Sequence, residues 1–155
     1  MKILILGNSN IFQRKVLPAL TKIKNLKMEL ASKSLKTTNI RYEKIYNNYE
    51  QALSETTANL VYISLVNSLH YKWAIKSLEY NKNLIIDKPI TLNLDQTKKI
   101  IKFASKKKLL VTEAIVFNFH KQFEKMCSFI DFKKKTLINT EFHVPKFNKN
   151  NFRNF

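Results

Sequence analysis

The chain opens, at residues 2–12, with the stretch KILILGNSNIF. Its first half is continuously apolar, which predicts a strand over residues 2–6 that is covered on both faces. A helical pattern follows over residues 11–24, and Pro18 should kink that helix or begin a fresh turn. A buried strand that leads through a glycine turn into a helix is how parallel α/β sheets begin, so this stretch decides the fold class.

The same alternation continues through the first 112 residues. Further apolar runs predict strands at 26–31, 43–46, 60–65, 84–86 and 109–111. Helical patterns occupy residues 49–57 and 68–80, and Asn93 is the predicted cap of one more helix. That last helix is expected to bury Leu94, Thr97, Ile100, Ile101 and Ala104. We therefore expect an α/β fold, a Rossmann-type doubly wound parallel sheet.

After residue 112 the pattern changes. Residues 117–130 are aromatic and helical toward their end, and residues 136–144 alternate as a half-exposed strand would. The last ten residues are polar and aromatic, with no predicted element. We expect one domain over residues 1–118 and, over 119–155, a linking helix and the start of a second α+β domain.

The turn after the first strand decides whether the sheet holds a dinucleotide. Dinucleotide-binding turns have glycine, glycine and then glycine or alanine, because backbone N–H groups and a helix N-terminus approach the pyrophosphate there. In this chain the three positions hold Gly7, Ser9 and Phe12. With one match in three, two interpretations stay open at this point: a phosphate-binding turn and an ordinary strand-to-helix turn.

Composition narrows the function classes. The net charge is +17, with 28 basic against 11 acidic residues, but only Arg14, Arg41 and Arg153 are arginines. Proteins that read bases or clamp phosphates rely on arginine, so we do not expect nucleic acid as the main partner. One cysteine excludes an internal disulfide framework, and no apolar run approaches the roughly 20 residues of a membrane span. We expect a cytoplasmic protein without a membrane partner.

Three later stretches carry a family resemblance: VYISLVNSLH at 61–70, NKNLIIDKP at 81–89 and EAIVFNFH at 113–120. In this order, with the intervening helices, they resemble the Gfo/Idh/MocA family of NAD(P)-dependent oxidoreductases. The family pattern there is a strand with Pro-Asn-x-x-His, a helix, Gly-Lys-His, a strand and Glu-Lys-Pro. The departures from it are Val66, Asn81, Asp87 and Asn118. The resemblance implies that residues 1–118 are an NAD(P)-binding Rossmann domain, and that the enzyme acts on a secondary hydroxyl or ketone of a sugar or cyclitol.

The resemblance makes Lys88 the candidate catalytic residue. In the family this lysine lies beside the nicotinamide and hydrogen-bonds the substrate hydroxyl that loses its proton. A lysine suits that task because burial can lower the pKa of a lysine side chain, and because an ammonium group stabilises a developing alkoxide. Pro89 restricts Lys88 to extended conformations. The alternative is a surface lysine in a lysine-rich chain.

The candidate cofactor contacts follow the strand ends of the predicted sheet. His70 is one of these candidates, and the alternative is that it lies at the start of a helix and forms hydrogen bonds only with backbone groups. No metal site is assigned, because the histidines have no metal-like spacing. The assigned cofactor-binding residues are Gly7, Ser9, Asn10, Ile11, Ser32, Lys33, Leu65, Asn67, His70 and Asp87.

The end of the second strand bears on the identity of the cofactor. A cofactor without a 2′-phosphate is usually gripped there by Asp or Glu, whereas this chain has Ser32, Lys33 and Ser34. Two hydroxyls and a cation suit a 2′-phosphate, so NADP is favoured and NAD stays open.

The resemblance also implies that the substrate-binding aspartate and histidine of the second domain lie beyond residue 155. We therefore expect a truncated product or a fragment, whose partners are a dinucleotide and a sugar-like molecule. A non-catalytic dinucleotide-binding module is the alternative, and a basic nucleic-acid-binding protein is less favoured. The sequence decides neither the substrate, nor the activity of the chain alone, nor the oligomeric state, and it leaves a homo-oligomer open.

Overall fold

The computed structural model describes residues 1–33, 42–131, 133–135, 137, 139–141 and 143. The chain divides into two compact units, Met1–Ile115 and Val116–Phe155. The domain boundary expected at residue 118 stays a prediction. In the described residues no helix is long and apolar enough to cross a membrane.

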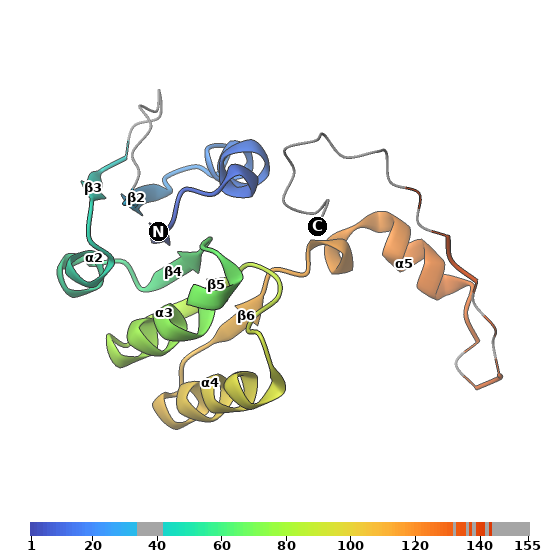
Figure 1. Ribbon diagram of the computed structural model, residues 1–155. Helices are drawn as coiled ribbons and strands as arrows, with labels where there is room; N and C mark the ends of the chain where they lie inside the picture. Colours follow the sequence, from blue (N-terminus) through green and yellow to red (C-terminus); the bar gives the residue numbers. More distant parts are fainter. Residues whose placement is uncertain (34–41, 132, 136, 138, 142, 144–155) are drawn as a thin grey trace. The chain divides into compact units, whose positions relative to one another are not determined.

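The first unit is built on a six-stranded sheet (Figure 1). The strands lie in the order β3-β2-β1-β4-β5-β6, and all neighbouring pairs are parallel. The predicted doubly wound parallel sheet is confirmed. The strand bounds are β1 Lys2–Leu6, β2 Lys27–Ala31, β3 Lys44–Tyr46, β4 Leu60–Ile63, β5 Asn83–Ile86 and β6 Val111–Glu113.

The sheet has a hydrophobic core on each face, which explains the continuous apolar runs. Alternate residues of β1 enter opposite cores: Leu4 and Leu6 belong to one, Ile3 and Ile5 to the other. The first core is completed by α2 (Tyr49–Glu55), α3 (Asn67–Glu79) and α4 (Leu94–Lys107). The second is completed by the π-helical turn η1 (Phe12–Val16) and by α1 (Leu17–Leu20). Pro18 lies in the first turn of α1 and so begins a fresh turn, one of the two predicted outcomes.

Two expectations at α4 and β6 are wrong. Leu94 and Ile101 are 66% and 56% exposed, and only the narrow stripe of Ile100 and Ala104 is buried on α4. The last strand begins at Val111 rather than at residue 109. The reason is the end of α4, where Lys108 is left-handed at φ 57° and Leu109 N donates to Ala104 O (2.9 Å). Leu109 thus belongs to the helix cap and not to the strand.

The second unit contains a short 3₁₀ turn η2 (Val116–Phe119) and the helix α5 (Lys121–Ser128). His120 caps α5 by accepting from Gln122 N at Nδ1 (3.1 Å). The strand expected at 136–144 falls partly outside the described residues, and the described ones among them are not in a strand. The last ten residues also lie outside the described part of the chain, as does Ser34.

Candidate functional site

The candidate site lies where the parallel strands of the first unit end. In the order β3-β2-β1-β4-β5-β6 the chain reverses direction across the sheet between β1 and β4. At such a switch point the loops that follow the two strands run to opposite sides and leave a crevice for ligands. Gly7 follows β1 and Ser64 follows β4, so these two residues meet at the switch point.

Gly7 is the only glycine of the chain, and the turn needs it for two reasons. Its φ is +97°, a conformation that side chains disfavour. A Cβ placed on it would lie 2.3 Å from Ser64 O and 2.7 Å from Leu65 Cδ2. Gly7 N also donates to Ala31 O (2.8 Å), which fixes the turn to the end of β2. The glycine therefore lets the turn after β1 approach the backbone at the end of β4.

Ser9 joins this turn to the neighbouring strands. Its Oγ accepts from Phe12 N (3.0 Å) and lies 2.7 Å from Ser64 Oγ. Ser64 Oγ in turn donates to Asp87 Oδ2 (2.7 Å), and Tyr62 OH donates to Asp87 Oδ1. Burial, followed by the Asp87 hydrogen bond and charge, raises the pKa of Tyr62 above its ordinary value. The four side chains Ser9, Ser64, Asp87 and Tyr62 thus form one connected cluster, which we call the hydroxyl–carboxylate chain.

Lys88 follows Asp87 at the end of β5 and is exposed. No ion pair of Lys88 is found within the described ranges. The backbone around it is held from three sides. Asp87 N donates to Ile63 O (3.0 Å), and Ile90 N donates to the Glu113 carboxylate (2.9 Å). The lysine is therefore an accessible cation on an anchored segment.

His70 supplies the third anchor of that segment. The imidazole is fully buried, with Nδ1 2.8 Å from Pro89 O and Nε2 3.0 Å from Leu65 O. Both ring nitrogens thus face backbone carbonyls, one in the loop after β4 and one in the segment after β5. This is the arrangement of the alternative weighed for His70, and its assignment as a cofactor contact stays a prediction.

The remaining predicted contacts lie at the ends of neighbouring strands. Ser32 is buried at the end of β2, and its N–H donates to Tyr46 O (2.9 Å). Lys33 is exposed, and its Nζ lies 5.9 Å from the centroid of the Tyr49 ring. Leu65 is half-buried after β4. Three predicted contacts are exposed at helix starts: Asn10, Ile11 and Asn67.

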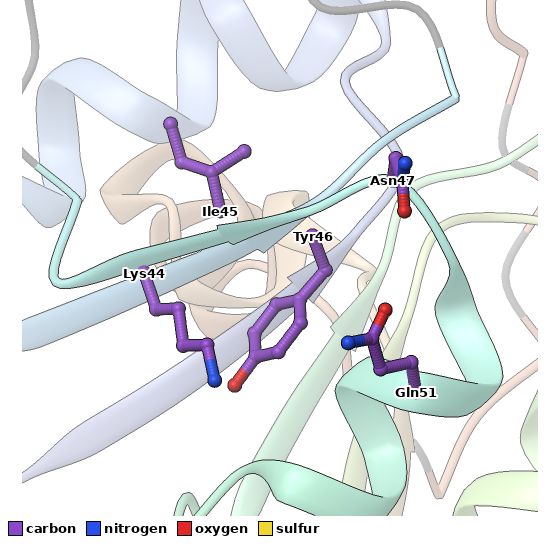
Figure 2. Close-up of a pocket in the computed structure, with 5 residues that line it drawn as sticks. All are labelled: Lys44, Ile45, Tyr46, Asn47 and Gln51. Carbon is purple, nitrogen blue, oxygen red and sulfur yellow. The ribbon is translucent and has the colours of Figure 1, made fainter.

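An open depression of about 590 Å³ lies along the edge strand β3 and the start of α2 (Figure 2). It contains none of the predicted site residues. On one side of β3, Tyr46 faces Gln51, and Lys44 pairs with Glu55 at 2.6 Å. This ion pair lowers the pKa of Glu55 and raises that of Lys44. The depression is lined by Lys44, Ile45, Tyr46, Asn47 and Gln51.

The donors at the strand ends suit an anionic ligand. Lys33 and Lys88 are exposed cations, and the carboxylates of Asp87 and Glu113, at the ends of β5 and β6, accept hydrogen bonds from protein groups. A dinucleotide pyrophosphate therefore fits the charge of this edge. Within the described part of the chain, no three His, Cys, Asp or Glu side chains gather in a way that could hold a metal ion.

Sequence reasoning missed Ser64, Tyr62 and Glu113. The signal for the first two was present, because Tyr62 and Ser64 are two residues apart and so share a face of the fourth strand. Their contact with Asp87 depends on the β4–β5 register, in which Ile63 lies beside Ile86. No pattern in the sequence alone gives that register.

Comparisons with known proteins point to one family. The profile described as "Oxidoreductase family, NAD-binding Rossmann fold" (GFO_IDH_MocA) matches residues 1–115. An uncharacterized oxidoreductase of Rhizobium meliloti is 27% identical over 128 residues, which are 79% of this chain and 38% of that protein. A D-xylose 1-dehydrogenase (NADP(+)) of Haloferax volcanii is 26% identical over 121 residues, 75% of this chain and 37% of that protein.

A solved structure shows the same fold. It is a 3-ketoreductase from Actinomadura kijaniata in complex with TDP-benzene and NADP. The TM-score is 0.76 at 24% identity, and the match covers 83% of this chain and 41% of the other. The chain thus spans about two fifths of the length of the relatives that it matches.

Proposed function

The chain belongs to the Gfo/Idh/MocA oxidoreductase family, whose NAD-binding Rossmann domain covers residues 1–115, and on that premise we propose a function for it. It is the dinucleotide-binding part of an enzyme that oxidises a secondary hydroxyl of a sugar-like molecule, or reduces the matching ketone. The observation that carries the proposal is the position of Lys88, an exposed cation at the end of β5, one strand from the switch point. No ion pair joins Lys88 to a carboxylate within the described ranges, and both oxygens of the neighbouring Asp87 accept hydrogen bonds from hydroxyl groups.

The cofactor would lie across the strand ends, with its pyrophosphate at the turn from Gly7 to Ile11. Phe12 N and Gln13 N of the helical segment there already donate to Ser9, so the N–H groups of Asn10 and Ile11 would be the donors for phosphate oxygens. Leu65 and Asn67 would border the nicotinamide half. When bound, the nicotinamide accepts or supplies a hydride, which is chemistry that no side chain of this chain supplies.

NADP is the cofactor that we favour, because of the residues after β2. Lys33 is exposed where a 2′-phosphate would lie, and neither Ser32 nor Lys33 is acidic. Ser32 is buried, so Lys33 carries most of this argument. The names of the Haloferax dehydrogenase and of the Actinomadura structure both contain NADP, which supports the choice.

Lys88 would hold the substrate oxygen. Its ammonium donates a hydrogen bond to that oxygen and stabilises the negative charge that develops as the hydroxyl proton leaves. The anchors at Pro89 O and Ile90 N keep the backbone beside it in place. Lys88→Met should therefore remove turnover in an enzyme that contains this domain while leaving dinucleotide binding within about threefold, because the pyrophosphate contacts lie elsewhere.

The test is a calorimetric titration of the 155-residue chain with NADPH, NADH and an unrelated oligonucleotide. A charge-assisted contact at Lys33 contributes about 1.5–3 kcal/mol, so Lys33→Asp should weaken NADPH binding at least about tenfold and leave NADH binding equal or better. Lys102→Asp, an equal charge change on the exposed face of α4, is the matched control and should leave both affinities within about twofold.

The outcomes separate the proposal from its rivals. Oligonucleotide binding without dinucleotide binding would contradict it. A chain that binds NADPH, and an enzyme containing it that never reduces or oxidises a sugar-like substrate at 340 nm, would favour the non-catalytic binding module. Equal weakening of NADPH by Lys33→Asp and Lys102→Asp would contradict the assignment of Lys33.

A further inference from the structure

We propose that Ser9, Ser64 and Asp87 are positioning residues that couple the turn after β1 to the segment that carries Lys88. The proposal rests on the proposed function, in which that turn holds the pyrophosphate and Lys88 holds the substrate oxygen. The hydroxyl–carboxylate chain spans three loops, since Ser9 follows β1, Ser64 follows β4 and Asp87 follows β5. It is the connection that we infer to transmit the position of one loop to the other.

The direction of every proton in this chain follows from its two ends. Phe12 N–H can only donate, so Ser9 Oγ accepts from it (3.0 Å). An ionised Asp87 can only accept, so Ser64 donates its single proton to Oδ2 (2.7 Å). The contact of 2.7 Å between the two serine oxygens is then a donation from Ser9 to Ser64. The Ser9 proton is thus used within the protein and is not offered to a phosphate.

The side chains of the hydroxyl–carboxylate chain are also held in one arrangement. Ser64 and Tyr62 are 1% and 4% exposed, so water does not compete for their hydrogen bonds. Tyr62 occupies Asp87 Oδ1 while Ser64 occupies Oδ2, so the carboxylate cannot turn toward Lys88 without giving up a buried donor. Asp87 therefore acts on Lys88 through the backbone that they share, and on the turn through the two serines.

Asp87→Asn tests this directly, because an amide has one oxygen where the carboxylate has two. Either Tyr62 or Ser64 must then face an NH₂ group and give up its donation. If Ser64 faces it, the proton order of both serines reverses and Ser9 no longer donates to Ser64. In that orientation a change beside Lys88 alters a turn on the far side of β4, and Ser64→Ala removes the same link whichever way the amide turns.

The first experiment uses two ligands on the full chain: NADPH, and ADP-ribose 2′-phosphate, which has the pyrophosphate but lacks nicotinamide. Asp87→Asn should lower the affinities for both ligands by similar factors of at least about fivefold, which is a normal size for coupling between sites. A residue that acted only on the nicotinamide side would weaken NADPH alone, and that result would overturn the proposal.

The second experiment is a double-mutant cycle between Ser9→Ala and Asp87→Asn, whose side chains meet only through Ser64. The double variant should bind ADP-ribose 2′-phosphate about as weakly as the worse single variant, because either change already breaks the connection. The matched control is Glu113→Gln, which changes another carboxylate that anchors the Lys88 segment but has no hydroxyl link to Ser9. Its effect should add to that of Ser9→Ala within about twofold.

The same cycle measured by urea unfolding without ligand separates this proposal from the proposed function. The shift in denaturation midpoint of the Ser9→Ala and Asp87→Asn double variant should be smaller than the two single shifts together. If the wild-type chain binds neither ligand, the proposed function fails, and the unfolding cycle still decides whether the connection exists. Ser64→Ala, which removes only a hydroxyl group, is the second variant should Asp87→Asn not fold. Combined with Ser9→Ala, it should also shift the midpoint by less than the two single shifts together. Additive shifts in the unfolding cycle would overturn the coupling.

Discussion

Replacing Gly7 by alanine should destabilise the first unit by about 2–5 kcal/mol, and two separate causes set this figure. At φ +97° an L side chain costs about 1–2 kcal/mol. The added Cβ would lie 2.3 Å from Ser64 O, so the turn must retreat by about 1 Å to reach a normal contact. That movement stretches the Gly7 N–Ala31 O hydrogen bond (2.8 Å) and the Ser9–Ser64 contact (2.7 Å), and such forced shifts cost about 1–3 kcal/mol.

Urea unfolding followed by circular dichroism measures this cost, and the chain offers a matched control. Asn25 is exposed and has φ 59°, so Asn25→Ala places an alanine in left-handed backbone on the surface. It should cost about 1 kcal/mol, the conformational part alone. The reasoning is wrong if Gly7→Ala and Asn25→Ala destabilise the protein equally, because the approach of the turn to Ser64 would then contribute nothing.

Three further predictions concern stability. Tyr62→Phe should cost about 1.5–3 kcal/mol at pH 7 by removing a bond to a charged group. Burial and Asp87 raise the pKa of Tyr62 in the folded protein, so the wild type loses stability as the pH rises above about 10. The difference in the free energy of unfolding between the wild type and Tyr62→Phe should therefore narrow. A difference that stays constant in urea unfolding from pH 7 to 11 would contradict this. Asn48→Ala should cost about 1 kcal/mol, since Asn48 Oδ1 caps α2 at two N–H groups, and Asn47→Ala should stay within about 0.5 kcal/mol in the same assay. Ile100→Ala should cost about 2–5 kcal/mol and Ile101→Ala less than about 0.5 kcal/mol in thermal or urea unfolding; equal costs would mean that α4 buries a wider face than the structure indicates.

The strands and their parallel arrangement could be predicted because strands that are covered on both faces appear in the sequence as continuous apolar runs. In β1 every residue from Ile3 to Leu6 is buried, and the printed sequence shows the same continuous apolar run. The helix start at Asn93 could be predicted too, since its side chain accepts from Gln96 N as the pattern requires. Such features depend on residues that are near each other along the chain.

Most of the errors and omissions involve residues that are distant along the chain; the start of β6 is the exception, because the local helix cap at Lys108 sets it. The exposure of Ile101 depends on where α4 lies over its neighbours, and helical periodicity alone does not contain that information. The hydrogen bonds from Tyr62 and Ser64 to Asp87 join β4 to the segment after β5. The hydrogen bond from Ile90 N to Glu113 joins that segment to β6. Lys88 and Gly7 were found because their immediate neighbours carry the pattern. Their roles in binding and catalysis stay predictions that the experiments above address.

The place of β1 in the strand order has a consequence for how the protein is made. This strand is synthesised before the other five strands of the sheet, yet it lies in the middle of the sheet, with Ile3 paired to Met28 on one side and to Leu60 on the other. Until Leu60 has left the ribosome, one edge of β1 has no native partner and presents unpaired backbone N–H and C=O groups to other chains. Closing that long loop is slow compared with local pairing, so the nascent chain is most vulnerable to misassociation until β4 (Leu60–Ile63) has been synthesised.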